Sequence, residues 1–164
     1  MVSLRTHLWF ITDGHAAAEF YVSLIPDSSI DAVHAAPEGV PGVAEGEPFL
    51  IDLTLGGVPV TILTAGPHVT IDEAFSFVLV CDDQEEIDHY WSALIADGGR
   101  ESQCGWCVDR FGLSWQVVPR VIDALTMGSD EASTRARTAM FAMGKLDLPA
   151  LQAAYDGTAS PSPS

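Results

Sequence analysis

The most conspicuous candidate for chemistry is a C-x-x-C motif, formed by Cys104 and Cys107 in the stretch ESQCGWCVDRFGLSWQVVP, residues 101–119. A redox-active pair needs its first thiol at a helix N-terminus, where the helix dipole lowers the pKa of that thiol. This motif lies instead in a strand-forming stretch, where residues three apart point to opposite faces. A structural zinc site would need about four ligands, and the third cysteine, Cys81, stands alone. We therefore interpret both cysteines of the motif as strand residues.

The histidines are the other residues that could bind a metal or move a proton. They show no H-x-x-H-type spacing and are scattered along the chain as His7, His15, His34, His68 and His89. A single histidine in a cavity more often makes a hydrogen bond than it ligates a metal. We therefore expect hydrogen bonding to be the role of any histidine in a site.

An internal repeat describes the elements that must position these side chains. The stretch HLWFITDGHAAAEFYVSL, 7–24, aligns with SFVLVCDDQEEIDHYWSA, 76–93, at a constant offset that places Asp13 on Asp82. Each copy begins with a β-type run and continues as a predicted helix. Each aspartate stands at the start of a predicted helix, where a carboxylate can accept hydrogen bonds from free amide groups.

Strand signals follow both predicted helices, and the Gly-Gly pair at 56–57 is typical of a hairpin turn. The predicted strands cover about 28–36, 48–57 and 58–66 after the first helix, then 100–107 and 112–118 after the second, with the turn DRFG between the last two. The fold class predicted from this order is α+β. Two βαβββ repeats would form a curved mixed sheet around a cavity, with helices added at the C-terminus.

The predicted domain organisation follows the repeats. A paired domain is expected at 1–119, with repeat one at about 1–66 and repeat two at about 73–119, followed by a helical extension at 120–155 and a disordered tail at 156–164. We expect two helices at 130–155, broken at Gly144 and around Pro149. Its apolar residues Met140, Phe141 and Met143 are interpreted as core or dimer interface.

The composition excludes several classes of function. Seven basic residues face 23 acidic ones, which gives a net charge of −16. Such a surface repels phosphate backbones and anionic lipids, so we expect no nucleic-acid or membrane partner. Residues 1–25 lack the pattern of a signal peptide, and three cysteines argue against a disulfide framework. We therefore expect a cytoplasmic protein with reduced thiols.

The doubled strand–helix–three-strand unit resembles the vicinal oxygen chelate superfamily, which includes glyoxalase I, extradiol dioxygenases, and the bleomycin and fosfomycin resistance proteins. The sequence is most similar to the PhnB-like branch, often labelled demethylubiquinone methyltransferase-like. The resemblance rests on residues 7–30, 73–94, 103–119 and 143–155. Methyltransferase activity is not expected, because the chain has no G-x-G-x-x-G segment between a strand and a helix.

In metal-using members of that superfamily, four inward-facing strand positions supply the metal ligands. The resemblance and the repeat place these positions at His7, Thr61, Ser76 and Gln116. Thr61 is matched to Gln116 by aligning Gly57 with Gly112, a register open to a shift of one or two residues. Because hydroxyl groups are poor ligands for transition metals, we expect a degenerate site without a metal or other cofactor.

Alternate residues of these strands should line a cavity with aromatic walls and a few polar groups, as is typical of a small-molecule pocket. The expected lining residues are His7, Trp9, Thr61, Ser76, Val78, Trp106, Ser114 and Gln116. The alternative, in which the tryptophans only fill the core, stays open at this point.

Three functions remain. The first is a metal-free protein that binds an unknown small molecule, for resistance or sequestration. The second is a metal-dependent lyase, isomerase or dioxygenase with an altered ligand set. The third is a structural or regulatory homodimer without a ligand. A homodimer is expected in each case, because the C-terminal helices carry apolar residues to bury.

Overall fold

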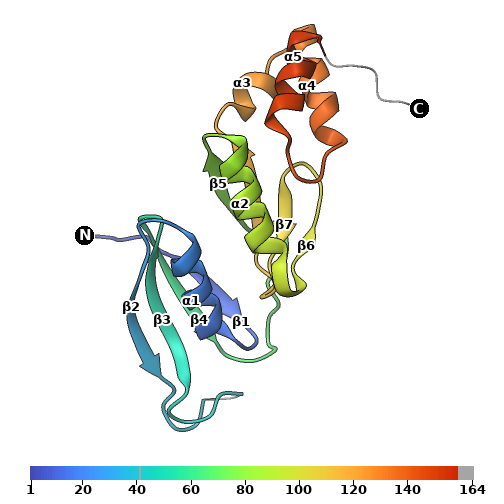
Figure 1. Cartoon of the computed structure of the whole chain (residues 1–164). Helices are drawn as coiled ribbons and strands as arrows, with labels where there is room; N and C mark the ends of the chain where they lie inside the picture. The colour runs from blue at the N-terminus through green and yellow to red at the C-terminus, as the bar shows by residue number, and fades with distance from the viewer. Residues whose placement is uncertain (41, 159–164) are drawn as a thin grey trace. The chain divides into compact units, whose positions relative to one another are not determined.

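The structure is a computed structural model that describes residues 1–40 and 42–158. The chain divides into two compact units, Met1–Asp72 and Glu73–Ser164, and each contains one of the predicted repeats (Figure 1). The grouping of 1–119 as one paired domain stays a prediction. Most of the predicted disordered tail, at 159–164, lies outside the described residues.

The first unit is a four-stranded sheet with one helix. Its sheet order is β1-β4-β3-β2, in which β1 and β4 run parallel and the other neighbours run antiparallel. The elements are β1 (Thr6–Phe10), α1 (Gly14–Leu24), β2 (Ser29–Ala35), β3 (Pro48–Leu55) and β4 (Val58–Thr64).

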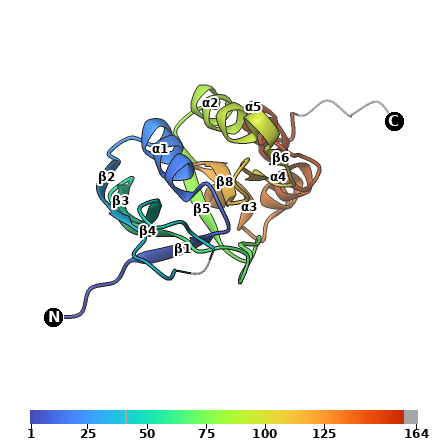
Figure 2. The ribbon, with the colours of Figure 1, turned by 90° about the horizontal axis from the view of Figure 1, so that it is seen from below.

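Helix α1 lies along one face of this sheet, as Figure 2 shows. Ala17, Ala18 and Tyr21 of the helix are fully buried, as are Ile51 and Ile62 of the strands that the helix contacts. Successive side chains of a strand point to opposite faces. Among the described residues of this unit, α1 is the one helix, so the side chains on the other face of the sheet have no helix over them.

The start of α1 approaches β4 closely at Gly14. A Cβ atom at this position would lie 2.3 Å from the Thr64 side-chain oxygen and 2.8 Å from a methyl carbon of Ile62. Only glycine allows the helix to begin so near the sheet.

The second unit repeats the same topology and adds three helices. Its sheet order is β5-β8-β7-β6, with β5 and β8 parallel. The elements of the repeat are β5 (Ser76–Cys81), α2 (Gln84–Ile95), a 3₁₀ turn (Ala96–Gly98), β6 (Arg100–Glu101), β7 (Trp106–Val108) and β8 (Ser114–Pro119). The α+β class and the doubled βαβββ plan predicted from the sequence are therefore confirmed, with the strands shared between two four-stranded sheets.

The C-terminal extension contains the two helices predicted at 130–155, α4 (Glu131–Phe141) and α5 (Leu148–Asp156), and the break between them includes Gly144. It also contains a short helix before them, α3 (Ile122–Thr126). The three helices enclose a core of Leu125, Ala136, Leu146 and Leu151. The predicted helix break around Pro149 is wrong. The proline lies in the first turn of α5, where its missing N–H group leaves no bond unmade.

The predicted aspartate caps are only partly right. Asp83, not Asp82, caps α2, because its Oδ1 accepts a hydrogen bond from the Glu86 amide at 2.9 Å. Asp82 instead forms an ion pair with Arg120 at 2.5 Å. Asp13 does precede α1, but its backbone is left-handed (φ 61°) and its side chain accepts no capping hydrogen bond from the helix.

The predicted strand at 100–107 is a hairpin, and the assignment of Cys104 to a strand is wrong. Cys104 lies in the turn between β6 and β7 with a left-handed φ of 56°. Its neighbour Gly105 also has a positive φ, and a Cβ atom there would lie 2.8 Å from the Val117 carbonyl oxygen. The turn is fixed further because the Cys104 amide donates to the Met143 carbonyl at 2.8 Å.

Within the described part of the chain, none of the helices has the length and the apolar character needed to cross a membrane.

Candidate functional site

The predicted site residues lie on the faces of the two sheets that α1 and α2 leave uncovered. On the first sheet, His7 and Trp9 alternate with the buried Leu8 and Phe10, and Thr61 stands opposite His7 in the parallel register. On the second sheet the corresponding residues are Ser76, Val78, Trp106, Ser114 and Gln116.

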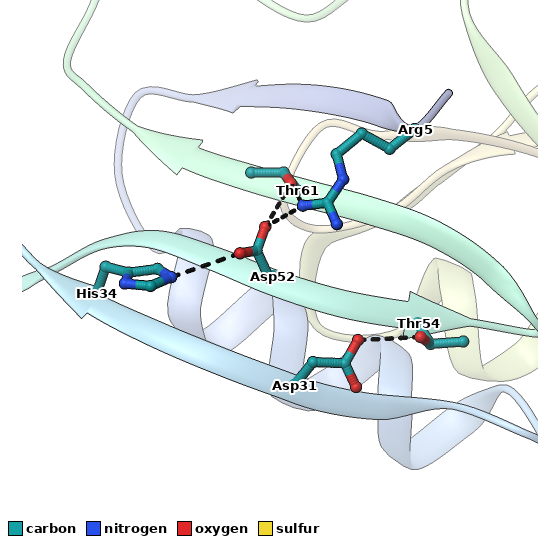
Figure 3. A network of polar contacts seen from close by, with 6 residues as sticks. All are labelled: Arg5, Asp31, His34, Asp52, Thr54 and Thr61. Carbon is teal, nitrogen blue, oxygen red and sulfur yellow. Dashed lines mark hydrogen bonds and ion pairs between the residues drawn. The ribbon is translucent and has the colours of Figure 1, made fainter. Parts of the chain in front are cut away.

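A polar network occupies the open face of the first sheet (Figure 3). The Arg5 guanidinium donates to Asp52 Oδ1 at 2.5 Å and to Thr61 Oγ1 at 2.8 Å. Thr61 in turn donates to Asp52 Oδ1 at 2.6 Å, and His34 Nε2 lies 3.4 Å from Asp52 Oδ2. The Thr61 hydroxyl, then His34 and Arg5, hold the pKa of Asp52 below its usual range against the opposing effect of burial.

This network leaves Thr61 poorly suited to contact a ligand. Its side chain is buried, and its hydroxyl oxygen already takes part in hydrogen bonds with Arg5 and Asp52. Trp9 is also held in place, because its indole N–H donates to the Gly66 carbonyl at 2.9 Å. His7 remains exposed at the same face.

A cavity of about 720 Å³ lies in the second unit and is the strongest candidate site. Three of the predicted residues, Val78, Trp106 and Gln116, line it together. The remaining lining residues come from the same strands and from the extension: Val80, Cys104, Val118, Pro119, Arg120, Ile122, Asp123, Thr126, Met127, Met140 and Phe141.

Gln116 is the main polar group on the sheet side of this cavity. Its Nε2 donates to Ser76 Oγ at 3.0 Å, which fixes the orientation of the amide and directs its oxygen away from Ser76. Ser76 therefore contributes to the site by holding Gln116. Ser114 does not line the cavity, because its side chain is fully buried.

Buried Asp109 positions the strand that carries Gln116. Its Oδ1 accepts hydrogen bonds from the amides of Phe111 at 2.8 Å and Leu113 at 3.1 Å, and its Oδ2 accepts from the Trp115 indole at 2.8 Å. The carboxylate thus closes the turn between β7 and β8 from inside. The sequence identified DRFG as a turn, but it did not indicate that the first residue of that turn is buried.

The cysteines differ in environment. Burial raises the pKa of the Cys107 thiol to about 12 and, with nearby carboxylates as the lesser cause, that of Cys81 to about 11. Both thiols are therefore protonated and unreactive near neutral pH. Cys104 lines the cavity from its turn, and all three cysteines are free.

The comparisons with known proteins agree with this fold. The profile of the 3-demethylubiquinone-9 3-methyltransferase family matches residues 3–118, well over half of the chain. The chain belongs to this family. None of the curated proteins that were searched matches the sequence significantly.

Several solved structures are similar to this chain. A PhnB protein from Bacillus cereus is 28% identical, with a TM-score of 0.64 over 72% of this chain and 99% of that one. Protein PA1353 from Pseudomonas aeruginosa has the same fold at 19% identity, with a TM-score of 0.58 over 73% and 98% of the two chains. The fosfomycin resistance protein FosX from Listeria monocytogenes is 13% identical, with a TM-score of 0.48 over 71% and 92%. The likeness to PhnB and PA1353 agrees with the fold described above.

The family match ends before the helical extension, yet the extension forms much of the cavity. Sequence reasoning missed two groups of lining residues. The first lies on or next to the sheet strands: Val80, Cys104, Val118, Pro119 and Arg120. The second belongs to the extension: Ile122, Asp123, Thr126, Met127, Met140 and Phe141. The sequence predicts Met140 and Phe141 to be apolar residues of a core or an interface. Phe141 is 60% exposed and Met127 is 75% exposed, so both present apolar surface at the cavity.

The predicted match of Thr61 to Gln116 is wrong by two residues. His7 pairs with Thr61 in the first sheet, whereas Ser76, the repeat equivalent of His7, pairs with Ser114. The reason is turn length. The turn between β3 and β4 has two residues, 56–57, whereas the turn between β7 and β8 has five, 109–113, so Gly57 and Gly112 are not equivalent positions. Leu63 is therefore the residue of the first repeat that corresponds to Gln116 in the second repeat.

The residues present offer little to a metal ion. Across residues 1–40 and 42–158, there is no group of three or more His, Cys, Asp or Glu side chains that could hold one. Leu63 at the position equivalent to Gln116 removes a further donor from the set that the resemblance implies.

Proposed function

We propose that this protein binds a small, largely apolar molecule in the cavity between the open face of the β5–β8 sheet and helices α3 and α4. The observation that carries the proposal is the convergence of Val78, Trp106 and Gln116 with residues of the extension around one space of about 720 Å³. Cavities of roughly 300–1,000 Å³ are usual for drug-sized ligands.

The chemistry of the walls supports a ligand with an apolar body. Val78 and Val80 are 49% and 48% exposed, which is unusual for adjacent apolar positions on one strand face. Met127 and Met140 add flexible, polarisable side chains that adapt to the shape of a ligand. The Gln116 amide, held by Ser76, would orient that ligand through a hydrogen bond.

Methyl transfer is not part of the proposal, although the family is described by that activity. Among the described residues, three turns lead from a strand into a helix, at 11–13, 82–83 and 120–121, and none of them contains a glycine. A Gly-rich turn at such a position is what usually receives a nucleotide-like cofactor.

A fluorescent probe tests the proposal directly. N-phenylnaphthylamine is neutral and becomes fluorescent in apolar surroundings, so titration of the purified chain should give saturable binding with one probe per chain. The variant Val80→Trp fills the cavity from an exposed strand position and should weaken binding by at least about tenfold, since its indole would occupy space that the probe needs and the probe would bury less of its apolar surface. Circular dichroism should show that the variant remains folded.

The matched control is Val58→Trp. Val58 is also a valine at a strand position and is 44% exposed, but it lies in the first unit and does not line the cavity. Its substitution should leave probe binding unchanged. Equal binding by the wild type and Val80→Trp, or an absence of saturable binding in the wild type, would refute the proposed function.

A further inference from the structure

We infer that the cavity selects ligands that combine an aromatic body with a positively charged group, such as arylalkyl amines. The inference rests on the proposed binding function and specifies the ligand class that the cavity takes.

The charges around the cavity favour a cation. Asp123 lines it from α3, its side chain is exposed, and its carboxylate has no hydrogen-bond or ion-pair partner among the described residues. The one basic lining residue, Arg120, is already bound to Asp82 at 2.5 Å, and Glu86 also interacts with it electrostatically. The charge of Arg120 is therefore largely balanced by Asp82, whereas the Asp123 carboxylate leaves a negative charge at the cavity that a cationic ligand could neutralise.

The apolar part of the cavity provides aromatic surface for such a ligand. Trp106 is partly buried in the sheet side of the cavity, and Phe141 is exposed on the helical side. The faces of aromatic rings attract cations as well as apolar groups. A ligand with a ring and an ammonium group would thus meet both kinds of lining at once.

The free carboxylate and one of the two rings come from the extension. Asp123 and Phe141 follow residue 118, where the family match ends, whereas Trp106 lies inside the matched region. The preference for a cation is therefore a property of this chain and its extension. The net charge of −16 adds a long-range attraction for cations.

Three probes with the same ring system and different charge test the inference. Naphthylmethylamine is cationic at neutral pH, naphthalenemethanol is neutral and naphthoate is anionic. Titration calorimetry at low salt should rank their affinities in that order. The amine should bind roughly three- to tenfold more tightly than the alcohol, as expected for one partly exposed charge contact with an aromatic neighbour.

The variant Asp123→Asn should remove most of the difference between the amine and the alcohol and leave the affinity of the alcohol unchanged. Its matched control is Glu131→Gln, which removes the same charge from an exposed residue of the extension outside the cavity. The control should retain the preference. Equal affinities for amine and alcohol in the wild type, or a preference for the amine that survives Asp123→Asn, would overturn the inference. In that case, binding of the alcohol would still support the proposed function. Failure of all three probes to bind would overturn the proposed function as well.

Discussion

The substitution Asp109→Asn tests whether one buried carboxylate holds the strand that carries Gln116. Asp109 is 3% exposed and accepts three hydrogen bonds, two from backbone amides and one from the Trp115 indole. Asparagine has the same shape but places an N–H₂ group against one of these donors. Hydrogen bonds to a charged group contribute about 1.5–3 kcal/mol each. We therefore expect the free energy of unfolding to fall by about 2–4 kcal/mol.

Urea denaturation followed by circular dichroism measures this change. A double-mutant cycle with Trp115→Phe isolates the indole bond, because the phenylalanine background no longer has a donor to lose. In that background, Asp109→Asn should cost about 1–2 kcal/mol less than in the wild type. The control is Asp97→Asn, which alters a carboxylate that is 76% exposed and paired with Arg110. Such an exposed pair should change stability by only about 0.5 kcal/mol.

Two outcomes would refute the reasoning. The first is a cost for Asp109→Asn no larger than that for Asp97→Asn. The second is additivity of the Asp109 and Trp115 substitutions to within about 0.5 kcal/mol, which would mean that the two side chains do not share a stabilising bond. In either case Asp109 could not be the residue that positions β8.

Two further predictions concern the thiols and the assembly. In the native protein at about pH 8, iodoacetamide should modify Cys104 and spare Cys81 and Cys107, because the buried thiols stay protonated; modification of all three at similar rates would contradict their burial. In the folded protein the pKa values of Cys81 and Cys107 are raised to about 11 and about 12, from an ordinary value of 9.0. Above pH 9 the unfolded chain therefore loses these protons first, and the free energy of unfolding should fall as the pH rises. Sedimentation should give a mass near twice 17.5 kDa, and a monomer at micromolar concentration would disprove the expected homodimer.

The elements could be predicted from the sequence because their signals are local. The β-type runs around residues 7–11 and 76–80 and the Gly-Gly pair at 56–57 fix strands and a turn with little influence from distant residues. The same local signals also place His7 and Trp9 on one face of their strand, opposite Leu8 and Phe10.

The wrong predictions concern contacts between residues that are far apart in the sequence, which local patterns do not reveal. The strand propensity around Cys104 is overridden by a turn that hydrogen-bonds with Met143, almost 40 residues later. The register of Thr61 was lost because two glycines in turns of different length were treated as equivalent. Phe141 could be identified as apolar, but only the packing of the helices against the second sheet shows that it lines a cavity.

The contacts between the extension and the second repeat bear on cooperativity. The Cys104 and Gly105 amides both donate to carbonyls of the segment between α4 and α5, at Met143 and Gly144. From α2, the Gln84 side-chain amide binds the chain where α5 begins: its oxygen accepts from the Leu148 amide at 2.7 Å, and its nitrogen donates to the Leu146 carbonyl at 3.2 Å. A chain cut after Pro119 would keep every strand but would lose the partners of these groups. The end of the family match is therefore not the end of the hydrogen-bonded unit, and we expect the extension to unfold together with the second repeat.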